Sequence, residues 1–248
     1  MNFNCIQIEA VSKRYRGAVT DSLKKVSLTI QTGDVYGILG PNGAGKTTLI
    51  SILCGILEAS DGRIVYRDNN EVVSFKGIQP KIGFVPQEYA LYQELTPIQN
   101  LEYFGALYNL SKEKIATRTK EILAILGLSR VAEHRVETFS GGMKRRVNLA
   151  IGIIHEPSIL FLDEPTVGVD VQSKVAILKF LNQLNQAGTT IIYTSHHLSE
   201  AQDFCNRIAL IDQGGIIMKG DIDALLSTHA SKDLKSLFIQ FTGEEYRD

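Results

Sequence analysis

Short apolar runs separated by turn residues fill the first part of the chain, a pattern typical of β-strands. Residues 26–30 alternate apolar and polar side chains, and residues 34–39 are mostly apolar and lead into a glycine-rich turn. Three further strands are predicted at residues 63–66, 71–75 and 81–85. Because turns separate these strands so closely, we expect a small antiparallel sheet beside the strand at 34–39.

From about residue 96 the apolar positions recur with the period of a helix. Thr96 and Pro97 form an N-cap and first-turn pair, and a second helix is expected to follow Ser111 and to end at Gly127. The apolar positions expected to share the buried faces are Ile98, Leu101, Phe104, Leu107, Ile115, Ile122, Leu123 and Leu126. Residues 88–155 are therefore predicted to form a helical subdomain.

Strands and helices alternate after this segment. Strands are predicted at residues 158–162, 189–194 and 207–212, and helices at residues 171–186 and 197–206. Alternation of this kind predicts a parallel sheet covered by helices. We therefore expect an α/β fold in which residues 1–87 and 156–220 form a core, residues 88–155 form a helical insertion and residues 221–248 form a C-terminal extension.

Composition excludes several classes of protein. With 26 basic and 27 acidic residues the net charge is −1, so no overall field attracts nucleic acid, and the basic run Lys144-Arg145-Arg146 is interpreted as a solvated helix face. The three cysteines are scattered and predict neither a disulfide framework nor a zinc site. The apolar runs fall far short of the roughly 20 residues of a membrane span, and the first residues lack the apolar centre of a signal peptide. We therefore expect the chain to stay in the cytosol.

The segment from residue 40 to residue 48 carries the strongest chemical signal. It fits the pattern G-x-x-x-x-G-K-[ST] and consists of Gly40, Pro41, Asn42, Gly43, Ala44, Gly45, Lys46, Thr47 and Thr48. Its glycines let backbone N–H groups turn toward a phosphate, and the helix predicted to follow adds partial positive charge. Lys46 would neutralise the β- and γ-phosphates, and the Thr47 hydroxyl would bind Mg²⁺. A dinucleotide site is disfavoured because the third glycine of G-x-G-x-x-G is missing.

Two further segments suggest chemistry. The apolar strand that ends at Asp163 would deliver this carboxylate to the carboxyl edge of the sheet to hold Mg²⁺, and Glu164 would act as general base toward water. Alone, this pair is equally well an acidic turn after a buried strand. Ser140, Gly141 and Gly142 open another predicted helix, where Ser140 is a good N-cap and the glycines expose N–H groups. Alone, this segment is a capped helix with a flexible entry.

At these three segments the chain resembles the ATP-binding subunits of ABC transporters, and the resemblance extends over most of the chain. The Ser-Gly-Gly segment between the phosphate loop and Asp163-Glu164 distinguishes that family from other phosphate-loop proteins. The resemblance implies a P-loop NTPase core with a mixed or parallel sheet, an N-terminal antiparallel β subdomain and an inserted helical subdomain. It implies ATP and Mg²⁺ as cofactors, and ATP hydrolysis that energises transport.

The resemblance also assigns roles to four more residues. Tyr15, shortly before the first strand of the sheet, matches the aromatic residue that stacks on adenine, and a half-buried strand tyrosine is the alternative. Gln87 matches the glutamine that reaches Mg²⁺ and the γ-phosphate and joins the two lobes. His196 matches the histidine that contacts the γ-phosphate, with His197 as a near alternative. Asp170 matches the loop that crosses to the opposite subunit.

Two segments depart from the usual family pattern. The signature Leu-Ser-Gly-Gly-Gln has Phe139 and Met143 at its ends here. The loop Ser-Ala-Leu-Asp is Val167-Gly168-Val169-Asp170, which loses a hydroxyl group. Both variants look like those of exporter-type members that serve drugs, lipids or polysaccharides. Export is therefore the expected direction of transport.

The resemblance implies partners as well. A second copy of the chain, or a related ATPase subunit, would pair with it head to tail, so that each ATP lies between the phosphate loop of one subunit and Ser140–Gly142 of the other. A separate membrane-spanning permease would supply the channel and hold the chain at the cytoplasmic face of the membrane. The expected docking surface is the segment 88–99, with packing inside the helical lobe as the alternative. Its apolar residues are Tyr89, Leu91, Tyr92 and Leu95.

Other functions fit the sequence less well. A soluble ABC-type ATPase of translation or DNA repair is the main alternative, but translation ATPases usually carry two nucleotide domains and repair ATPases a long coiled-coil insertion. A regulatory GTPase would need an Asn-Lys-x-Asp motif, which is missing. A pure binding module would have no need of Glu164.

Overall fold

The computed structural model describes residues 3–68 and 71–243, and the chain divides into two compact units. Unit 1 contains residues 1–79 and 190–248, and unit 2 contains residues 80–189. The helical segment 88–155 that the sequence predicts lies within unit 2. Both units combine strands with helices, which confirms the α/β fold class.

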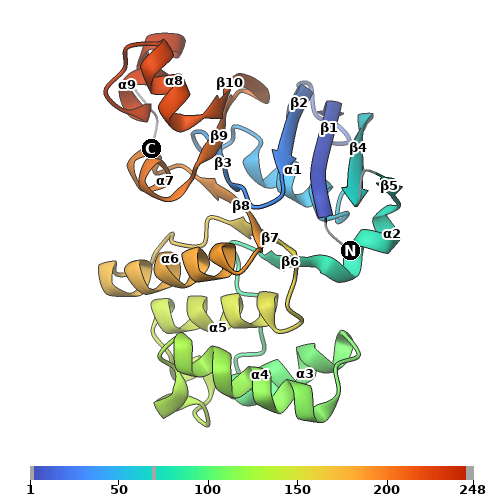
Figure 1. The fold of residues 1–248 in the computed structure, drawn as a ribbon, viewed down its shortest axis with the longest axis vertical. Helices are drawn as coiled ribbons and strands as arrows, with labels where there is room; N and C mark the ends of the chain where they lie inside the picture. Colours follow the sequence, from blue (N-terminus) through green and yellow to red (C-terminus); the bar gives the residue numbers. More distant parts are fainter. Residues whose placement is uncertain (1–2, 69–70, 244–248) are drawn as a thin grey trace. The chain divides into compact units, whose positions relative to one another are not determined.

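Unit 1 contains an antiparallel sheet with the strand order β2-β1-β4-β5 (Figure 1). Its strands are β1 (Phe3–Lys13), β2 (Leu23–Gln31), β4 (Asp61–Asp68) and β5 (Glu71–Val73). At its centre Ile6 lies opposite Ile30 on one side and Tyr66 on the other, and all three are buried. The predicted antiparallel subdomain is confirmed, but its inner strand β1 is not predicted. The register shifts after Ile8, where Ala10 has a φ of +49°, and this bulge breaks the alternation.

A second sheet of unit 1 contains β3 (Val35–Leu39), β8 (Thr190–Ser195), β9 (Arg207–Asp212) and β10 (Gly215–Asp221). Strand β3 runs parallel to both β8 and β9, and β10 returns antiparallel to β9. The return is made at Gln213 and Gly214, whose positive φ values of 46° and 80° suit a two-residue hairpin turn. The expected mixed sheet, parallel at its centre, is therefore confirmed in unit 1.

The helices of unit 1 are α1 (Lys46–Leu53), α2 (Phe75–Ile78), α7 (Leu198–Phe204), α8 (Ile222–Thr228) and α9 (Leu234–Thr242). The segment predicted as a strand over residues 71–75 ends early, because Ser74 caps α2 by accepting from the N–H of Gly77. The C-terminal extension forms α8 and α9, and α9 packs on α7 with Leu234, Leu237 and Phe238 buried.

Unit 2 contains two parallel strands, β6 (Ile82–Val85) and β7 (Ile159–Asp163). Its helices are α3 (Pro97–Leu107), α4 (Lys112–Ile125), α5 (Gly141–Ile153) and α6 (Val171–Gln186). Helix α5 packs against α6 and against α3, which in turn packs on α4 (Figure 1). The assignment of the strand at 81–85 to the antiparallel sheet is wrong, because β6 pairs in parallel with β7 and Phe84 lies opposite Phe161. A short apolar run carries no sign of its direction or partner.

Two glycines let α5 lie directly against β6. A methyl group at Gly83 would lie 2.4 Å from the carbonyl oxygen of Gly152, and one at Gly152 would lie 2.5 Å from Cγ2 of Val85. Both distances are too short for non-bonded atoms, so the close approach depends on the absence of side chains. Because β6 ends two residues before Gln87, this packing fixes the start of the segment that carries Gln87.

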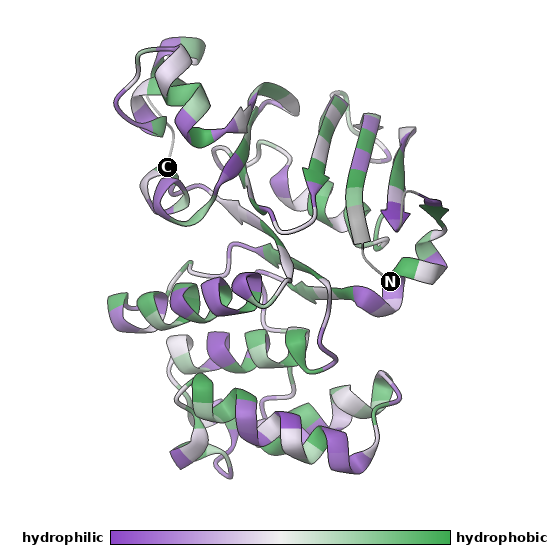
Figure 2. Cartoon of the chain, in the orientation of Figure 1, coloured by the Kyte–Doolittle hydropathy of each residue, from purple (hydrophilic) through white to green (hydrophobic). Residues whose placement is uncertain are grey.

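The predicted N-cap of α3 is confirmed, whereas its predicted buried face is confirmed only in part. Thr96 and Gln99 form a reciprocal capping box at the start of α3. Leu107 was expected to be buried but is 62% exposed, because the buried face of α3 runs through Pro97, Leu101 and Gly105 instead. Figure 2 shows hydrophilic and hydrophobic residues interspersed along α6, the longest helix of the described residues. Over residues 3–68 and 71–243, no helix combines the length and the hydropathy that crossing a bilayer would require.

Candidate functional site

The phosphate loop of unit 1 connects β3 to α1 and depends on its glycines. A methyl group at Gly40 would lie 2.0 Å from the carbonyl oxygen of Ile211 in β9, so only glycine fits there. Gly43 and Gly45 have φ values of +79° and +106°, a region that side chains disfavour. The loop therefore passes directly against β9 before it turns into α1.

Lys46 opens α1 with only 5% of its surface exposed. Its Nζ donates to the carbonyl oxygens of Gly40 (2.8 Å) and Pro41 (3.2 Å), so the ammonium group lies across the loop. The N-cap residue is Gly45, which has no side chain to accept from the first-turn N–H groups. The next residue, Thr47, is exposed. A helix start of this kind beside a buried ammonium group favours the binding of a phosphate.

The end of β8 contacts the same loop. The carbonyl oxygen of Ser195 accepts from the N–H of Gly40 at 3.3 Å, so His196, the next residue, begins beside the loop. The rings of His196 and His197 lie 4.0 Å apart. His197 is the N-cap residue of α7, and its N–H donates to Oγ of Ser195. His197 thus belongs to the helix start, which leaves His196 as the better candidate for a role at the loop.

Tyr15 lies between β1 and β2. The expectation that it precedes the first strand of the sheet is therefore wrong, because the bulged β1 comes before it. The Tyr15 hydroxyl is 3.2 Å from Oγ1 of Thr48, and Nζ of Lys13 is 5.8 Å from the centre of its ring. The ring is exposed, and its hydroxyl group touches the end of the phosphate loop.

Strand β7 of unit 2 ends in two buried carboxylates. Asp163 is the last residue of this fully buried strand, as the sequence predicts, and Asp163 and Glu164 are 2% and 6% exposed. Glu164 has a φ of +47°, which is unfavourable for a residue other than glycine, and its carbonyl oxygen accepts from the N–H of Val167. Backbone strain of this kind concentrates at functional sites.

The start of α5 is capped and exposed. The Ser140 side chain accepts from the N–H of Met143 at 3.3 Å, and Ser140 and Gly141 are both exposed. Gly142 is buried against the start of α6, where a methyl group would lie 2.5 Å from Oγ of Ser173. This 13-residue helix therefore offers its first turn to an anion, while Gly142 lets it approach α6 closely.

Asp170 caps α6, and its Oδ1 accepts from the N–H of Ser173 at 2.9 Å. Hydrogen bonds from the backbone and side chain of Ser173 hold the pKa of Asp170 below its ordinary value. A methyl group at Gly142 would lie 2.8 Å from Oδ2 of Asp170, so the start of α5 and the cap of α6 are in contact.

The Gln87 side chain is exposed, but its backbone is tied to α5. Arg145, only 4% exposed, donates to the carbonyl oxygens of Gln87 (2.7 Å) and Pro86 (3.2 Å). Asn148, one turn later, also donates to the carbonyl oxygen of Pro86. The interpretation of the basic run 144–146 as a solvated face is therefore wrong at its middle residue, because backbone carbonyls after β6 cover it.

Each unit gathers part of the predicted site. Unit 1 brings the phosphate loop together with Tyr15 and His196, while unit 2 joins Gln87 to the start of α5 and ends β7 in the two carboxylates. Arg145, which joins the backbone of Gln87 to α5, is not among the residues predicted from the sequence. Its position in the helix could have revealed it, because Arg145 lies three residues before the buried Asn148 and seven before Gly152 and so shares their face of α5.

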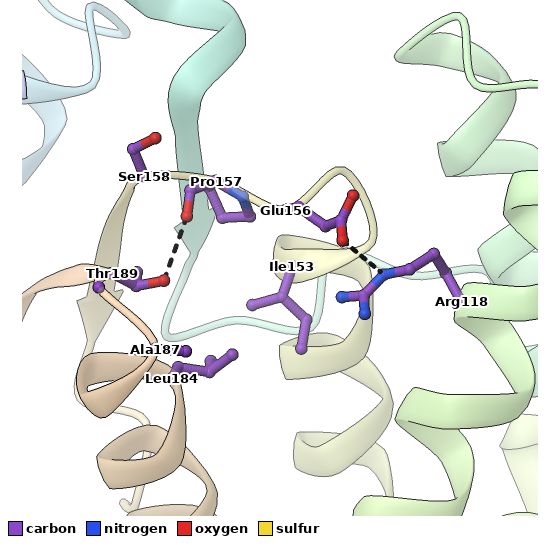
Figure 3. A pocket seen from close by; sticks show the side chains of 9 residues that line it. Arg118, Ile153, Glu156, Pro157, Ser158, Leu184, Ala187 and Thr189 are labelled. Carbon is purple, nitrogen blue, oxygen red and sulfur yellow. Dashed lines mark hydrogen bonds and ion pairs between the residues drawn. The ribbon is translucent and has the colours of Figure 1, made fainter. Parts of the chain in front are cut away.

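A cavity of about 330 Å³ in unit 2 lies apart from these residues (Figure 3). It lies near the start of β7, the end opposite to Asp163. Nε of Arg118 lies 3.7 Å from Oε1 of Glu156 in this cavity, and Thr189 donates to the carbonyl oxygen of Pro157. None of the predicted site residues lines it, so it supports no role in the predicted chemistry.

Comparison with known proteins settles which family these segments represent. Residues 23–167 match the family described as ABC transporter. The chain belongs to the ABC transporter family. It is 41% identical over 244 residues to the linearmycin resistance ATP-binding protein LnrL of Bacillus subtilis, covering 97% of this chain and 77% of that one.

Solved structures agree with this assignment. An ATP-binding subunit of an ABC transporter is 25% identical and aligns with a TM-score of 0.84 over 96% of this chain and 99% of its own. A dimeric ATP-binding cassette, solved in a post-hydrolysis state with ADP and Pi, is 27% identical with a TM-score of 0.77 over 87% and 98%. The protein is therefore an ABC ATPase, an ATP-binding and ATP-hydrolysing subunit of the kind that drives transport. The predicted resemblance and the P-loop NTPase fold are both confirmed.

Proposed function

We propose that Glu164 is the general base of ATP hydrolysis in this ABC ATPase, and this residue carries the proposal. Glu164 is 6% exposed, it is held at a strained φ of +47°, and it directly follows Asp163 at the end of a buried strand. A carboxylate fixed in this way suits the activation of an attacking water. The hydrogen bond from the N–H of Val167 to the carbonyl oxygen of Glu164 holds this turn and so reduces the reorganisation that positioning would otherwise require.

The phosphate loop is the proposed binding site for the triphosphate. Its backbone N–H groups surround the phosphates, and Lys46 exchanges its bonds to two loop carbonyls for bonds to the β- and γ-phosphates. Tyr15 supplies an exposed ring beside Thr48 on which adenine stacks. His196, which begins beside Gly40, contacts the γ-phosphate.

The oxygen donors of the chain fit Mg²⁺. The Thr47 hydroxyl, the Gln87 amide oxygen and the Asp163 carboxylate are hard ligands, and in nucleotide sites Mg²⁺ is held by one or two carboxylates together with substrate phosphates. The part of the chain that the structure describes contains no cluster of three or more His, Cys, Asp or Glu able to hold a metal. When bound, Mg²⁺ neutralises charge on the β- and γ-phosphates.

A second copy of the chain, or a related ATPase subunit, completes the proposed site. Ser140 and Gly141 are exposed at the start of α5, where N–H groups and the helix dipole favour a phosphate from outside the chain. A head-to-tail pair would bring this start to the γ-phosphate bound by the partner. Asp170, which touches Gly142, would lie at the same subunit contact. The related cassette solved as a dimer supports this arrangement.

The proposed permease contact is an aromatic surface of unit 2. Tyr92 and Tyr103 are both exposed, their rings meet edge to face at 5.0 Å, and Phe104 packs against both. Together with Tyr89 they extend the segment 88–99 onto α3, in keeping with a docking surface for a membrane-spanning protein. The chain would then lie at the cytoplasmic face of a membrane. Because LnrL is named for linearmycin resistance, export is the proposed direction.

Substitution of Glu164 by glutamine tests the proposal. The variant keeps the shape of the side chain but loses the base, so MgATP should still bind while phosphate release falls by about 10²-fold or more. Light scattering after chromatography with saturating MgATP should show a trapped dimer. Normal phosphate release would refute the role of Glu164, and a monomer at saturating MgATP, alone and with the membrane partner, would refute the composite site.

The docking surface is tested separately. Tyr92→Glu places a charge in the exposed aromatic cluster and should abolish MgATP-dependent copurification with the permease. Phosphate release by the purified chain should stay unchanged, since Tyr92 makes no contribution to the proposed nucleotide site. Ile125→Glu, which charges an exposed apolar position on α4, is the matched control and should leave copurification intact. Equal copurification of all three proteins would contradict the assignment of this surface.

A further inference from the structure

Arg145 is a buried cation with an unusual set of partners. It is 4% exposed, and its Nε has no hydrogen-bond partner among the residues that the structure describes. Its guanidinium group instead donates from one terminal nitrogen to the carbonyl oxygens of Pro86 and Gln87, at 3.2 and 2.7 Å. Two carbonyl bonds from one nitrogen compensate a buried guanidinium poorly for the loss of water.

Tyr89 closes a circuit between Arg145 and the start of α5. The Arg145 guanidinium lies 5.1 Å from the centre of the Tyr89 ring, and the Tyr89 hydroxyl donates to the carbonyl oxygen of Gly141 at 3.2 Å. Gln87, Arg145, Tyr89 and Gly141 are therefore linked in sequence by direct contacts. Any shift of the first turn of α5 must be transmitted to the backbone of Gln87 or break one of these contacts.

The electrostatics of Arg145 connect it to the carboxylates at the end of β7. Burial lowers the pKa of Arg145, and Tyr89, Asp163 and Glu164 act in the opposite direction. A neutral donor such as a glutamine amide would meet the same carbonyl oxygens at a smaller cost of desolvation. A charge kept in such surroundings, near two buried carboxylates, points to a role in the site rather than in packing.

The neighbouring Arg146 shows what a structural arginine of the same helix does. It donates to the carbonyl oxygens of Gly142, on its own helix, and Leu126, at the end of α4. These bonds tie two helix ends together and do not reach the segment that carries Gln87. The two residues therefore differ in the part of the molecule that they hold.

We propose that Arg145 is a positioning residue of the ATPase reaction, which fixes Gln87 to the start of α5 and so couples the Ser140–Gly142 segment to Gln87. The inference rests on the proposed function of these residues. When the start of α5 engages a phosphate of the partner subunit, the circuit through Tyr89 and Arg145 sets the position of Gln87. Hydrolysis thereby depends on a residue that acts through its contacts with Gln87 and Tyr89.

The test compares Arg145→Gln and Arg145→Lys with Arg118→Lys, a matched replacement of another arginine of unit 2, whose partners are Glu121 and Glu156. Steady-state phosphate release gives kcat, KM and the Mg²⁺ concentration for half-maximal rate, and thermal unfolding gives Tm. Arg145→Gln should lower kcat at least about tenfold, because displaced catalytic groups lose rate steeply, while KM changes less than about twofold. It should also raise the Mg²⁺ requirement, and Arg145→Lys should restore part of kcat. Arg118→Lys should change none of the kinetic values.

Several results would overturn the inference. A kcat within about twofold of the parent in folded Arg145→Gln would do so, as would equal losses in kcat and nucleotide binding. If Arg145→Gln does not fold, Tyr89→Phe decides, since it removes only the hydroxyl that bonds Gly141. It should lower kcat about threefold at an unchanged Tm, and an unchanged kcat would overturn the circuit. Glu164→Gln assayed in parallel separates the two proposals, because an active Glu164→Gln refutes the proposed function instead.

Discussion

Replacement of Gly152 by alanine tests the packing of α5 on β6, which holds the segment that carries Gln87. The added methyl group would lie 2.5 Å from Cγ2 of Val85 and 3.2 Å from the carbonyl oxygen of Phe84, and Val85 is fully buried. Overpacking of a core costs about 1–3 kcal/mol, whereas alanine gains about 1 kcal/mol over glycine inside a helix. We therefore expect Gly152→Ala to lower the free energy of unfolding by about 1 kcal/mol.

A second substitution isolates the steric contribution. Val85→Ala removes two buried methyl groups and should cost about 2 kcal/mol by itself. It also removes the atom that the new methyl group meets, so the double variant should lose only about 1 kcal/mol, the cost of Val85→Ala less the helical gain. Independent effects would instead add to about 3 kcal/mol. The expected interaction energy is therefore about 2 kcal/mol, with the double variant more stable than the sum predicts.

Urea unfolding followed by circular dichroism gives these free energies for the parent, the two single variants and the double variant. Val136→Ala is the matched control, because Val136 is another fully buried valine of unit 2 that is not among the atoms nearest to Gly152. Its effect should add to that of Gly152→Ala. Additivity within about 0.5 kcal/mol for the Val85 pair would refute direct contact between α5 and β6 at this position.

Three further predictions concern single positions. Thr96→Ala should lower the free energy of unfolding by about 1 kcal/mol through loss of the capping box, and Thr96→Ser, which keeps the hydroxyl, should not. Burial lowers the pKa of His155, so as the pH falls the imidazole is protonated in the unfolded chain before it is protonated in the folded one. The free energy of unfolding should therefore be level above about pH 6.5 and fall below it. Urea titrations of His155→Gln should show a smaller fall. Gly40→Ala should weaken ATP binding at least ~10-fold in calorimetry, since its methyl group would lie 2.0 Å from a β9 carbonyl oxygen, whereas Gly215→Ala, with 3.8 Å of room, should bind normally.

Local chemistry explains which elements the sequence reveals. The caps at Thr96, Ser111, Ser140 and Asp170 each use a side chain that accepts from an N–H three residues later, so each is readable from a few neighbouring letters. Strand partners depend on distant residues. The parallel pairing of β6 with β7 joins segments on either side of the helical subdomain, and no pattern of neighbouring residues predicts it.

The site likewise contains features that neighbouring residues predict and features that they do not. The phosphate loop is predicted from its own residues, because glycines at Gly40, Gly43 and Gly45 answer a local need for close approach and positive φ. The backbone strain at Glu164 is not predicted, because a residue other than glycine gives no sign in the sequence that its φ is +47°. It follows from the sharp turn that the chain must make after a buried strand.

Helix α5 shows why a charged residue can be misread. Hydropathy places Arg145 with its basic neighbours on a solvated face, yet Gly141, Arg145, Asn148 and Gly152 recur at helical spacing and face β6 and the segment that follows it. That segment offers backbone carbonyl oxygens, and such a surface is matched by donors and glycines rather than by apolar side chains. A polar stripe on a helix can therefore face either water or the backbone of another segment. Glycine within the stripe favours the second, because a close approach to backbone requires the absence of a side chain. The burial of Arg145 and its bond to Gln87 are then consequences of one requirement, that α5 lie against the backbone that carries Gln87.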